Sequence, residues 1–396
     1  MKDVRTWIEI DAKVLRKNAE QFLRLIPPGT RLMAVIKSNA YGHGLVMVAK
    51  ELAELRSTNI PDLVPLGGTK SGMEQLWFGV DSITEALRLR REGIKNPILV
   101  LGFTLPSRLG EAAEKGIALT VSNTGALKAI GTLTRRPPVH IKIDTGMHRQ
   151  GFFPAEMPHI IRLLTRFKIK PEGICTHFAS AKDPRDPRYT LKQLSVFRDV
   201  TSEMERAGYG GMIRHAAASG GTILFPESRL DMVRVGMGLY GYWPSPESRD
   251  TRHITRNTEI SLKLALTWKT IVSEVKSIPK GALVGYDGTE RVGRPTRIAV
   301  LPVGYWHGID RGLSQIGDVV IRGRKAKMLG RISMDMTVVD VTDIPGVKPG
   351  DGAILIGGRG KKAISADAIA EKIQTTAYEI LTRINPLIRR TIIHDE

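Results

Sequence analysis

Short apolar segments alternate with amphipathic stretches along the first 245 residues of the chain. Each apolar segment is four or five residues long and ends near Gly, Ser, Asn or Asp, which is typical of a buried strand followed by a turn. The segments predicted as strands span residues 32–36, 77–80, 98–101, 118–121, 139–143, 174–177, 213–216 and 232–235. The pattern therefore predicts eight strands separated by helices.

The stretches between these strands have helical spacing. Residues 82–91 begin with Ser-x-x-Glu, a capping box, ahead of Ala86 and Leu87, and residues 191–206 carry a longer amphipathic pattern. Eight strand–helix units within about 240 residues favour a closed (β/α)8 barrel over an open doubly wound sheet. The expected fold class is α/β, a TIM-type barrel.

The alternation of strands and helices ends at about residue 255, after which predicted strands follow one another with few helices between them. The strands predicted there span residues 262–275, 297–303, 317–321, 326–329, 337–341 and 353–356. One helix is expected over residues 366–384, with Ser365 as its N-cap. We therefore expect a barrel domain over residues 1–250 and a β-rich domain over residues 251–396.

Three segments fall outside this regular pattern. A strand candidate within residues 4–10 precedes the barrel, and both a place in the barrel domain and pairing with the C-terminal domain stay open. Residues 245–256 are polar and predict a linker. Residues 57–72 are rich in Pro and Gly, and they predict a long loop between the first barrel helix and the second barrel strand.

Composition narrows the class of protein. Hydrophobic residues make up 42% and charged residues 25% of the 396 positions, which is the profile of a globular rather than a disordered chain. Cys175 is the one cysteine, so a disulfide framework within the chain is excluded. No apolar run approaches the roughly 18 residues of a membrane span, and no secretion signal is evident at the start, so we expect a cytoplasmic protein.

The charge is strongly basic, since 59 Lys and Arg residues less 40 Asp and Glu residues give +19. Such a balance raises the hypothesis of nucleic-acid binding, and equally that of an enzyme with anionic ligands. The run at residues 320–327 contains four cations. However, aromatic residues are only 6%, and neither a stacking motif nor a zinc spacing is present. The run is better explained as a solvated hairpin face.

The densest chemical signal is Lys37, which directly follows a predicted buried strand at residues 32–36. Burial of a lysine favours its neutral, nucleophilic amine. The alternative is a lysine that extends from the strand end into water. The following residues 38–44 are mostly small and predict a flexible loop that a ligand can approach closely.

Other polar residues fall at the carboxyl ends of later strands, the end at which barrel enzymes build their sites. Each has a structural alternative, such as a core histidine or a paired arginine, but together they predict one site with a phosphate subsite near Ser219. These residues are Arg149, His177, Ser219, Gly220, Arg234 and Gly236.

Residues 35–44, VIKSNAYGHG, resemble the pyridoxal-phosphate attachment motif of bacterial alanine racemases, with Ser38 where Ala is usual. The resemblance extends over nearly the whole chain. Further matching segments are residues 77–80, 141–147, 176–179, 232–236, 303–305 and 330–335. The family fold is a barrel followed by a β domain, in agreement with the pattern of strands.

The resemblance implies a pyridoxal-phosphate-dependent racemisation of L-alanine and D-alanine that supplies D-alanine for peptidoglycan. Lys37 would hold the cofactor as a Schiff base and act as one base, and Tyr286 would act as the second base on the other face of the substrate. A free tyrosine is a weak base near neutrality, so Tyr286 would need a cationic network, which His177 beside Arg234 would provide.

The resemblance also implies roles for the remaining residues. Arg234 would face the pyridine nitrogen, Arg149 would position the cofactor phenolic oxygen and the substrate carboxylate, and Lys142 is either carbamylated or an ordinary strand-end lysine. Tyr305 would line the entrance and Met334 would bind the substrate carboxylate through its N–H group. The phosphate would be held by Tyr41, Ser219, Gly236 and Met237. No metal is implied, and the expected assembly is a head-to-tail homodimer with composite sites.

Three further positions depart from the family pattern. Pro386 stands where a tyrosine usually contacts the phosphate, Ala218 where an Asn is common, and Ser333 where a Cys is frequent. We expect weaker cofactor retention as a result. Racemisation of serine or lysine on the same scaffold stays open as an alternative. Residues 333–335 lack the Cys-based motif that the decarboxylase branch would need.

Overall fold

The computed structural model describes residues 4–55, 75–249, 260–358 and 360–394. The chain divides into two compact units. The barrel unit contains residues Leu15–Ser38 and Leu45–Lys263, and the C-terminal unit contains Met1–Val14, Asn39–Gly44 and Leu264–Glu396. The loop expected at residues 57–72 lies outside the described residues, and of the predicted linker only residues 245–249 are described.

Eight parallel strands follow one another around the barrel in chain order. Neighbouring strands β2 to β9 are paired in register, and the sheet closes where Arg234 N–H of β9 donates to the Ala217 carbonyl beyond β8 at 3.0 Å. The strands are β2 (Arg31–Val35), β3 (Leu76–Val80), β4 (Ile98–Val100), β5 (Ala118–Val121), β6 (Val139–Lys142), β7 (Gly173–Cys175), β8 (Ile213–His215) and β9 (Met232–Val235). The predicted barrel is confirmed.

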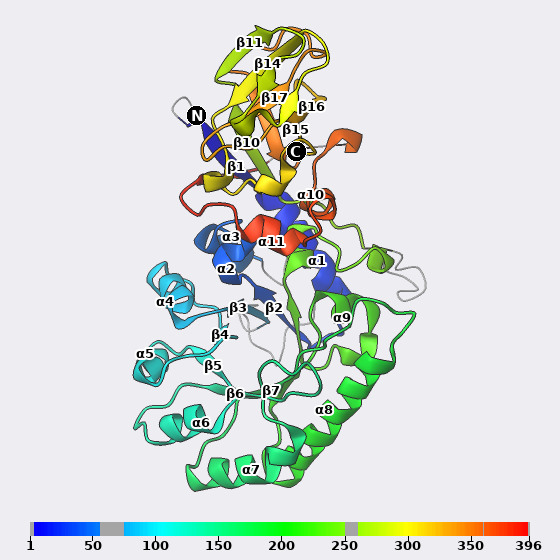
Figure 1. Cartoon of the computed structure of the whole chain (residues 1–396). Helices are drawn as coiled ribbons and strands as arrows, with labels where there is room; N and C mark the ends of the chain where they lie inside the picture. The colour runs from blue at the N-terminus through cyan, green and yellow to red at the C-terminus, as the bar shows by residue number, and fades with distance from the viewer. Residues whose placement is uncertain (1–3, 56–74, 250–259, 359, 395–396) are drawn as a thin grey trace. The chain divides into compact units, whose positions relative to one another are not determined.

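Helices follow the strands on the outer side of the barrel, where Figure 1 shows α4 to α8 surrounding the strands. At the start of α4, Ser82 caps the Glu85 N–H at 3.3 Å, while the Glu85 carboxylate accepts from the Asp81 N–H at 2.9 Å. The helices are α1 (Ala12–Leu25), α3 (Leu45–Ala53), α4 (Ile83–Arg91), α5 (Leu109–Glu114), α6 (Thr124–Gly131), α7 (Met157–Arg166), α8 (Arg188–Arg206) and α9 (Ser219–Leu224).

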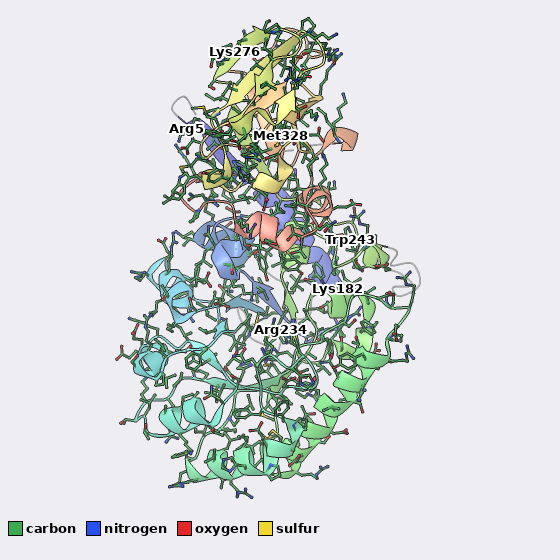
Figure 2. The ribbon with its side chains drawn as sticks, in the orientation of Figure 1. Arg5, Lys182, Arg234, Trp243, Lys276 and Met328 are labelled. Carbon is green, nitrogen blue, oxygen red and sulfur yellow. The ribbon has the colours of Figure 1, made fainter. Side chains whose placement is uncertain are left out.

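The interior of the barrel contains charged and polar side chains beside apolar ones. His140 on β6, His215 on β8 and Arg234 on β9 are all buried. Figure 2 labels the Arg234 side chain among the barrel strands. Gly173 on β7 gives the His140 ring its space, because a Cβ at Gly173 would lie 2.3 Å from His140 Nδ1.

The C-terminal unit is built on a nine-stranded sheet in the order β11-β14-β17-β16-β15-β18-β10-β1-β19. The first strand of the chain, β1 (Thr6–Asp11), is antiparallel to β10 (Leu266–Ile271) and parallel to β19 (Arg389–Ile393). The other strands are β11 (Glu274–Ile278), β14 (Thr296–Leu301), β15 (Asp318–Ile321), β16 (Arg324–Leu329), β17 (Thr337–Asp340) and β18 (Gly352–Ile356), with a separate hairpin of β12 (Leu283–Val284) and β13 (Glu290–Arg291).

The basic run at residues 320–327 forms the hairpin between β15 and β16, turning at Arg322 and Gly323 with positive φ angles. Along β16, Arg324, Lys325 and Lys327 are exposed while the alternate residue Ala326 is buried. Lys325 and Lys327 therefore share the face opposite Ala326, and Arg324 is exposed beside the turn.

Two predicted elements of this unit were wrong. The single helix expected over residues 366–384 is two helices, α10 (Ala366–Lys372) and α11 (Ala377–Thr382), because Gln374 adopts φ +56° and breaks the helical path. Ser365 does cap the first, accepting from Ala368 N–H at 3.2 Å. The expected strand over residues 262–275 is interrupted after Ile271, so its parts belong to β10 and β11.

None of the helices in the described ranges is both long and apolar enough to span a lipid bilayer.

Substituting Gly173→Ala will destabilise the barrel unit. The new methyl group would meet His140 at 2.3–2.5 Å, and relieving that overlap costs about 1–3 kcal/mol in a packed interior. The free energy of unfolding, measured by urea denaturation, should fall accordingly. Gly110→Ala in α5 is the matched control, because no atom lies within 4 Å of its new Cβ and alanine favours a helix by about 0.5–1 kcal/mol. Equal effects of the two substitutions would contradict the packing argument.

Candidate active site

Lys37 follows β2 and begins α2 (Lys37–Tyr41), a single helical turn. The four residues Ser38 to Tyr41 have φ between +51° and +55°, so this turn is left-handed. The flexible loop predicted here was therefore wrong. For L-residues the left-handed helix costs roughly 1–2 kcal/mol per residue. The Lys37 side chain is 37% exposed, and its Nζ lies 3.9 Å from Asp81 Oδ1.

Local hydrogen bonds and close packing hold this strained turn. Gly44 N–H donates to the Asn39 carbonyl at 2.9 Å, and His43 N–H donates to the Ala40 carbonyl at 3.0 Å. Gly42, at φ +84°, comes so close to α11 that a Cβ there would lie 2.2 Å from the Leu381 carbonyl oxygen. This close packing fixes the turn. A residue larger than glycine at position 42 would prevent it.

Tyr41 at the end of the turn packs against Tyr378 of α11. The ring centroids are 5.9 Å apart and the rings are inclined by 65°, an edge-to-face contact. Burial raises the pKa of Tyr378, so its hydroxyl keeps its proton. Tyr378 was not among the predicted site residues.

Arg234 is the central cation of the barrel interior. Its two terminal nitrogens donate to five acceptors: Nδ1 of His215 at 2.8 Å, Nδ1 of His177 at 3.2 Å, and the carbonyls of His215, Thr176 and Ala216 at 2.7–3.0 Å. All five acceptors are neutral. Burial lowers the pKa of Arg234, but a guanidinium remains protonated in proteins. The barrel therefore contains a buried positive charge without a carboxylate contact.

Two histidines form a hydrogen-bonded chain with Arg234. Which ring nitrogen of each carries the proton follows from the hydrogen bond that Arg234 donates. Because Arg234 can only donate, Nδ1 of His215 accepts and its Nε2 carries the proton. That Nε2 lies 2.8 Å from Nδ1 of His140, and Nε2 of His140 lies 3.2 Å from a Glu172 carboxylate oxygen. The chain thus runs Arg234–His215–His140–Glu172, with both histidines neutral. Burial, reinforced by Arg234, lowers the pKa of His215 well below its ordinary value.

His177 experiences the same positive field. Burial is the first cause and Arg234, Lys142, Arg149 and Lys37 add to it, lowering the pKa of His177 to about 3. His177 is therefore a neutral hydrogen-bonding group at any pH near neutrality.

Lys142 and Arg149 complete the set of cations. Burial lowers the pKa of Lys142, whose Nζ donates to Gln150 Oε1 at 3.2 Å. Arg149 lies on an exposed loop that Asp144 shapes by accepting from the N–H groups of Gly146 and His148 at 2.9–3.0 Å. Four cations thus lie near enough to His177 to lower its pKa, an arrangement suited to an anionic ligand.

A second group of donors lies where β9 ends. The Ser219 hydroxyl accepts from Gly236 N–H at 3.1 Å and from Gly238 N–H at 3.5 Å. Met237 begins the next turn and is buried. Ala218 stands at the N-cap of α9 and gives it no side-chain cap, the place where the family pattern has Asn. Hydroxyl and backbone donors of this kind bind phosphate oxygens.

Three loops of the C-terminal unit carry Tyr286, Tyr305 and Met334. The loops approach so closely that a Cβ at Gly304 would lie 2.1 Å from the Ser333 carbonyl and one at Gly330 would lie 2.4 Å from the Val284 carbonyl. Tyr305 N–H donates to the Ser333 carbonyl at 3.1 Å. The loops border a hollow of about 650 Å³ whose lining includes both tyrosines.

The predicted site residues thus form two groups. Tyr41 belongs to the 39–44 segment of the C-terminal unit, together with Tyr286, Tyr305 and Met334. The barrel group contains Lys37, Lys142, Arg149, His177, Ser219, Arg234, Gly236 and Met237. Sequence reasoning missed His140, His215 and Glu172, although an isolated histidine within an apolar strand was the available signal. Across the described ranges, no cluster of three or more His, Cys, Asp and Glu residues is placed to hold a metal ion.

Comparisons with known proteins cover nearly the entire chain. Residues 10–60 and 70–244 match the family model for the alanine racemase N-terminal domain, and residues 265–392 match that for the C-terminal domain. The alanine racemase of Leptospira interrogans serovar copenhageni is 36% identical over 396 residues, which cover 99% of this chain and 97% of that protein.

Solved structures agree with the described fold. The alanine racemase from Streptomyces lavendulae, a producer of D-cycloserine, matches with a TM-score of 0.86 and 31% identity over 99% of this chain and 98% of that one. The alanine racemase from Bartonella henselae, which contains covalently bound pyridoxal phosphate, matches with a TM-score of 0.81 and 27% identity over 98% of this chain and 100% of that one.

Lowering the pH from about 7 to about 5 will destabilise the protein. Burial, the leading cause in each, holds the pKa of His177 at about 3 and that of His43 at about 4, against about 6.5 in an unfolded chain. The unfolded state therefore binds protons that the folded state excludes, and each such histidine removes about 1.4 kcal/mol of stability per pH unit below about 6.5.

Urea denaturation of the cofactor-free protein at the two pH values measures this loss. His177→Gln keeps a neutral acceptor for Arg234 but removes one titrating group, so its stability should fall less steeply as the pH decreases. An identical pH slope for the variant and the unmodified protein would rule out His177 as a contributor.

Proposed function

The chain belongs to the alanine racemase family and interconverts L- and D-alanine with pyridoxal phosphate, and on that basis we propose that Lys37 and Tyr286 are its two catalytic bases. The observation that carries the barrel half of this proposal is the group of cations beside Lys37. Arg234, Arg149 and Lys142 all lower the pKa of His177, and Arg234 has only neutral contacts. Among the described residues, cations outnumber the one carboxylate, Asp81, that lies near Lys37, which suits an anionic cofactor and substrate.

The residues present fit pyridoxal phosphate. The Ser219 hydroxyl accepts from the N–H groups of Gly236 and Gly238 and can donate its own proton to a phosphate oxygen, and Lys37 supplies the amine for a covalent link. When bound, the cofactor draws electron density from the alanine Cα and makes its proton acidic. Arg234 keeps its own proton, so beside the cofactor ring it would donate a hydrogen bond to the pyridine nitrogen and would leave that nitrogen unprotonated. Arg149, exposed on its loop, binds the substrate carboxylate, and carbamylation of Lys142 stays a prediction.

Racemisation requires that a proton leave one face of Cα and another arrive on the opposite face. Lys37 Nζ takes or returns the proton on one face, and Tyr286 Oη does so on the other. Tyr305 lines the same hollow in the C-terminal unit as Tyr286 and narrows the approach to it. The Met334 N–H binds the substrate carboxylate.

We further propose a head-to-tail homodimer in which the C-terminal unit of each chain completes the site of its partner. An exposed apolar face on the C-terminal unit supports this assembly, since large exposed apolar patches mark interfaces and aromatic and Met side chains are enriched there. Its members are Tyr286, Tyr305, Trp306, Met334 and Met336, which are 43–68% exposed.

The role of Lys37 predicts one site of covalent modification. Borohydride reduction of the purified protein, followed by peptide mapping, should place a pyridoxyl group on Lys37. Lys37→Ala should lose both the modification and at least about 10³-fold in racemase activity, because the covalent link and one base are removed together. A pyridoxyl group on Lys142 instead, with Lys37 unmodified, would refute the assignment.

Tyr286→Phe should retain cofactor binding and lose at least about 10²-fold in racemisation, measured by chiral chromatography of alanine, because one base is removed.

The same variant tests the composite site. Mixing Lys37→Ala with Tyr286→Phe chains under conditions of subunit exchange should restore about a quarter of wild-type activity, since half of the dimers are mixed and each has one intact site. A site built within one chain would give no restoration.

A further inference from the structure

The left-handed turn after Lys37 requires support from outside itself. Four consecutive non-glycine residues in this conformation are unfavourable, and such strain persists only where the surroundings over-determine the backbone. The hydrogen bonds of His43 N–H and Gly44 N–H stabilise the turn internally, but both lie at its carboxyl end. A contact from a distant part of the chain adds to them at the same end of the turn.

Arg390 provides that contact from the far end of the chain. Its Nε donates to the Gly42 carbonyl at 3.1 Å across a separation of 348 residues. Its terminal nitrogens donate to the carbonyls of Asn385 at 2.8 Å, Ile388 at 2.5 Å and Ile384 at 3.3 Å. Burial lowers the pKa of Arg390 to about 10, so the guanidinium is still charged near neutrality. One planar cation thus joins the turn to residues 384–388.

Residues 384–388 are themselves anchored. Asn385 N–H donates to the His307 carbonyl and Asn385 Nδ2 donates to the Trp306 carbonyl, each at 3.1 Å. His307 and Trp306 belong to the loop that carries Tyr305. Arg390 therefore connects two parts of the C-terminal unit. It contacts Gly42 at the end of the turn, and through residues 384–388 it is linked to the loop that carries Tyr305.

We propose that Arg390 is a positioning residue that locks the left-handed turn behind Lys37 and so fixes the direction of the lysine side chain. The inference rests on the proposed role of Lys37. When the charged donor is removed, the Gly42 carbonyl loses its partner and Ser38 to Tyr41 relax towards conformations that L-residues prefer. Lys37 begins that turn, so its amine then samples many directions, and capture of the cofactor and proton transfer both slow.

Three variants separate this role from general stability. Arg390→Gln removes the positive charge and the planar guanidinium that donates through three nitrogens. Arg390→Lys keeps the charge but has a single donor group. Arg389→Gln is the control. Arg389 is the exposed neighbour on β19, without a side-chain hydrogen bond or ion pair to any described residue.

Hydrogen–deuterium exchange of the segment 37–44 in the cofactor-free protein is the first readout. In Arg390→Gln the amides of His43 and Gly44 should exchange at least tenfold faster, Arg390→Lys should lie between Gln and wild type, and Arg389→Gln should match wild type. The barrel helices serve as an internal reference, since their exchange should not change. Unchanged exchange at 37–44 in Arg390→Gln would overturn the proposal.

The second readout is the loaded enzyme. Arg390→Gln should bind pyridoxal phosphate at least tenfold more slowly and lose about tenfold in kcat with little change in KM, with partial rescue by Lys. If Arg390→Gln does not fold, Arg390→Lys tests the proposal by itself. Exchange of residues 37–44 and a kcat that both equal the wild-type values in Arg390→Lys would then refute the positioning role. Absence of cofactor from Lys37 in wild type would refute the proposed function, while exchange in the cofactor-free protein would still test Arg390.

Discussion

The buried charge of Arg234 orders the polar interior of the barrel unit. It can only donate, so it dictates which nitrogen of His215 carries a proton, and through His215 it dictates the same for His140. The His140 ring needs space that only glycine at position 173 leaves. The same charge helps to keep His177 neutral. A cation placed in an apolar interior is costly unless satisfied, and here the satisfaction comes from neutral groups, which leaves the attraction for an anion undiminished.

The fold was predictable where the information is local. Apolar runs such as Ala118–Val121 and Met232–Val235 marked the barrel strands because both faces of a parallel strand are buried. Residues near the strand ends, including Lys37 and Arg234, could be assigned to one end of the barrel because its parallel strands have their carboxyl ends together. The break at Gln374 was not predictable, because its residue type gives no signal for a positive φ.

The part of the site that escaped prediction depends on partners far apart in sequence. The left-handed turn at Ser38 to Tyr41 contradicts the local preference of its residues other than Asn39, and its supports at Leu381 and Arg390 follow more than 300 residues later. The histidine chain likewise links three different strands and Glu172. Periodicity identifies a buried histidine, but it does not identify which other strand supplies the acceptor.

The place of β1 has a consequence for how the protein is made. Thr6–Asp11 emerges early during synthesis, yet both strands that flank it, Leu266–Ile271 and Arg389–Ile393, emerge much later. A strand with unpaired edges is a template for association with other chains, and nascent domains otherwise fold from the N-terminus onwards. The nascent chain must therefore carry this strand unpaired on both edges while the barrel forms, which exposes the strand to chaperones and to aggregation.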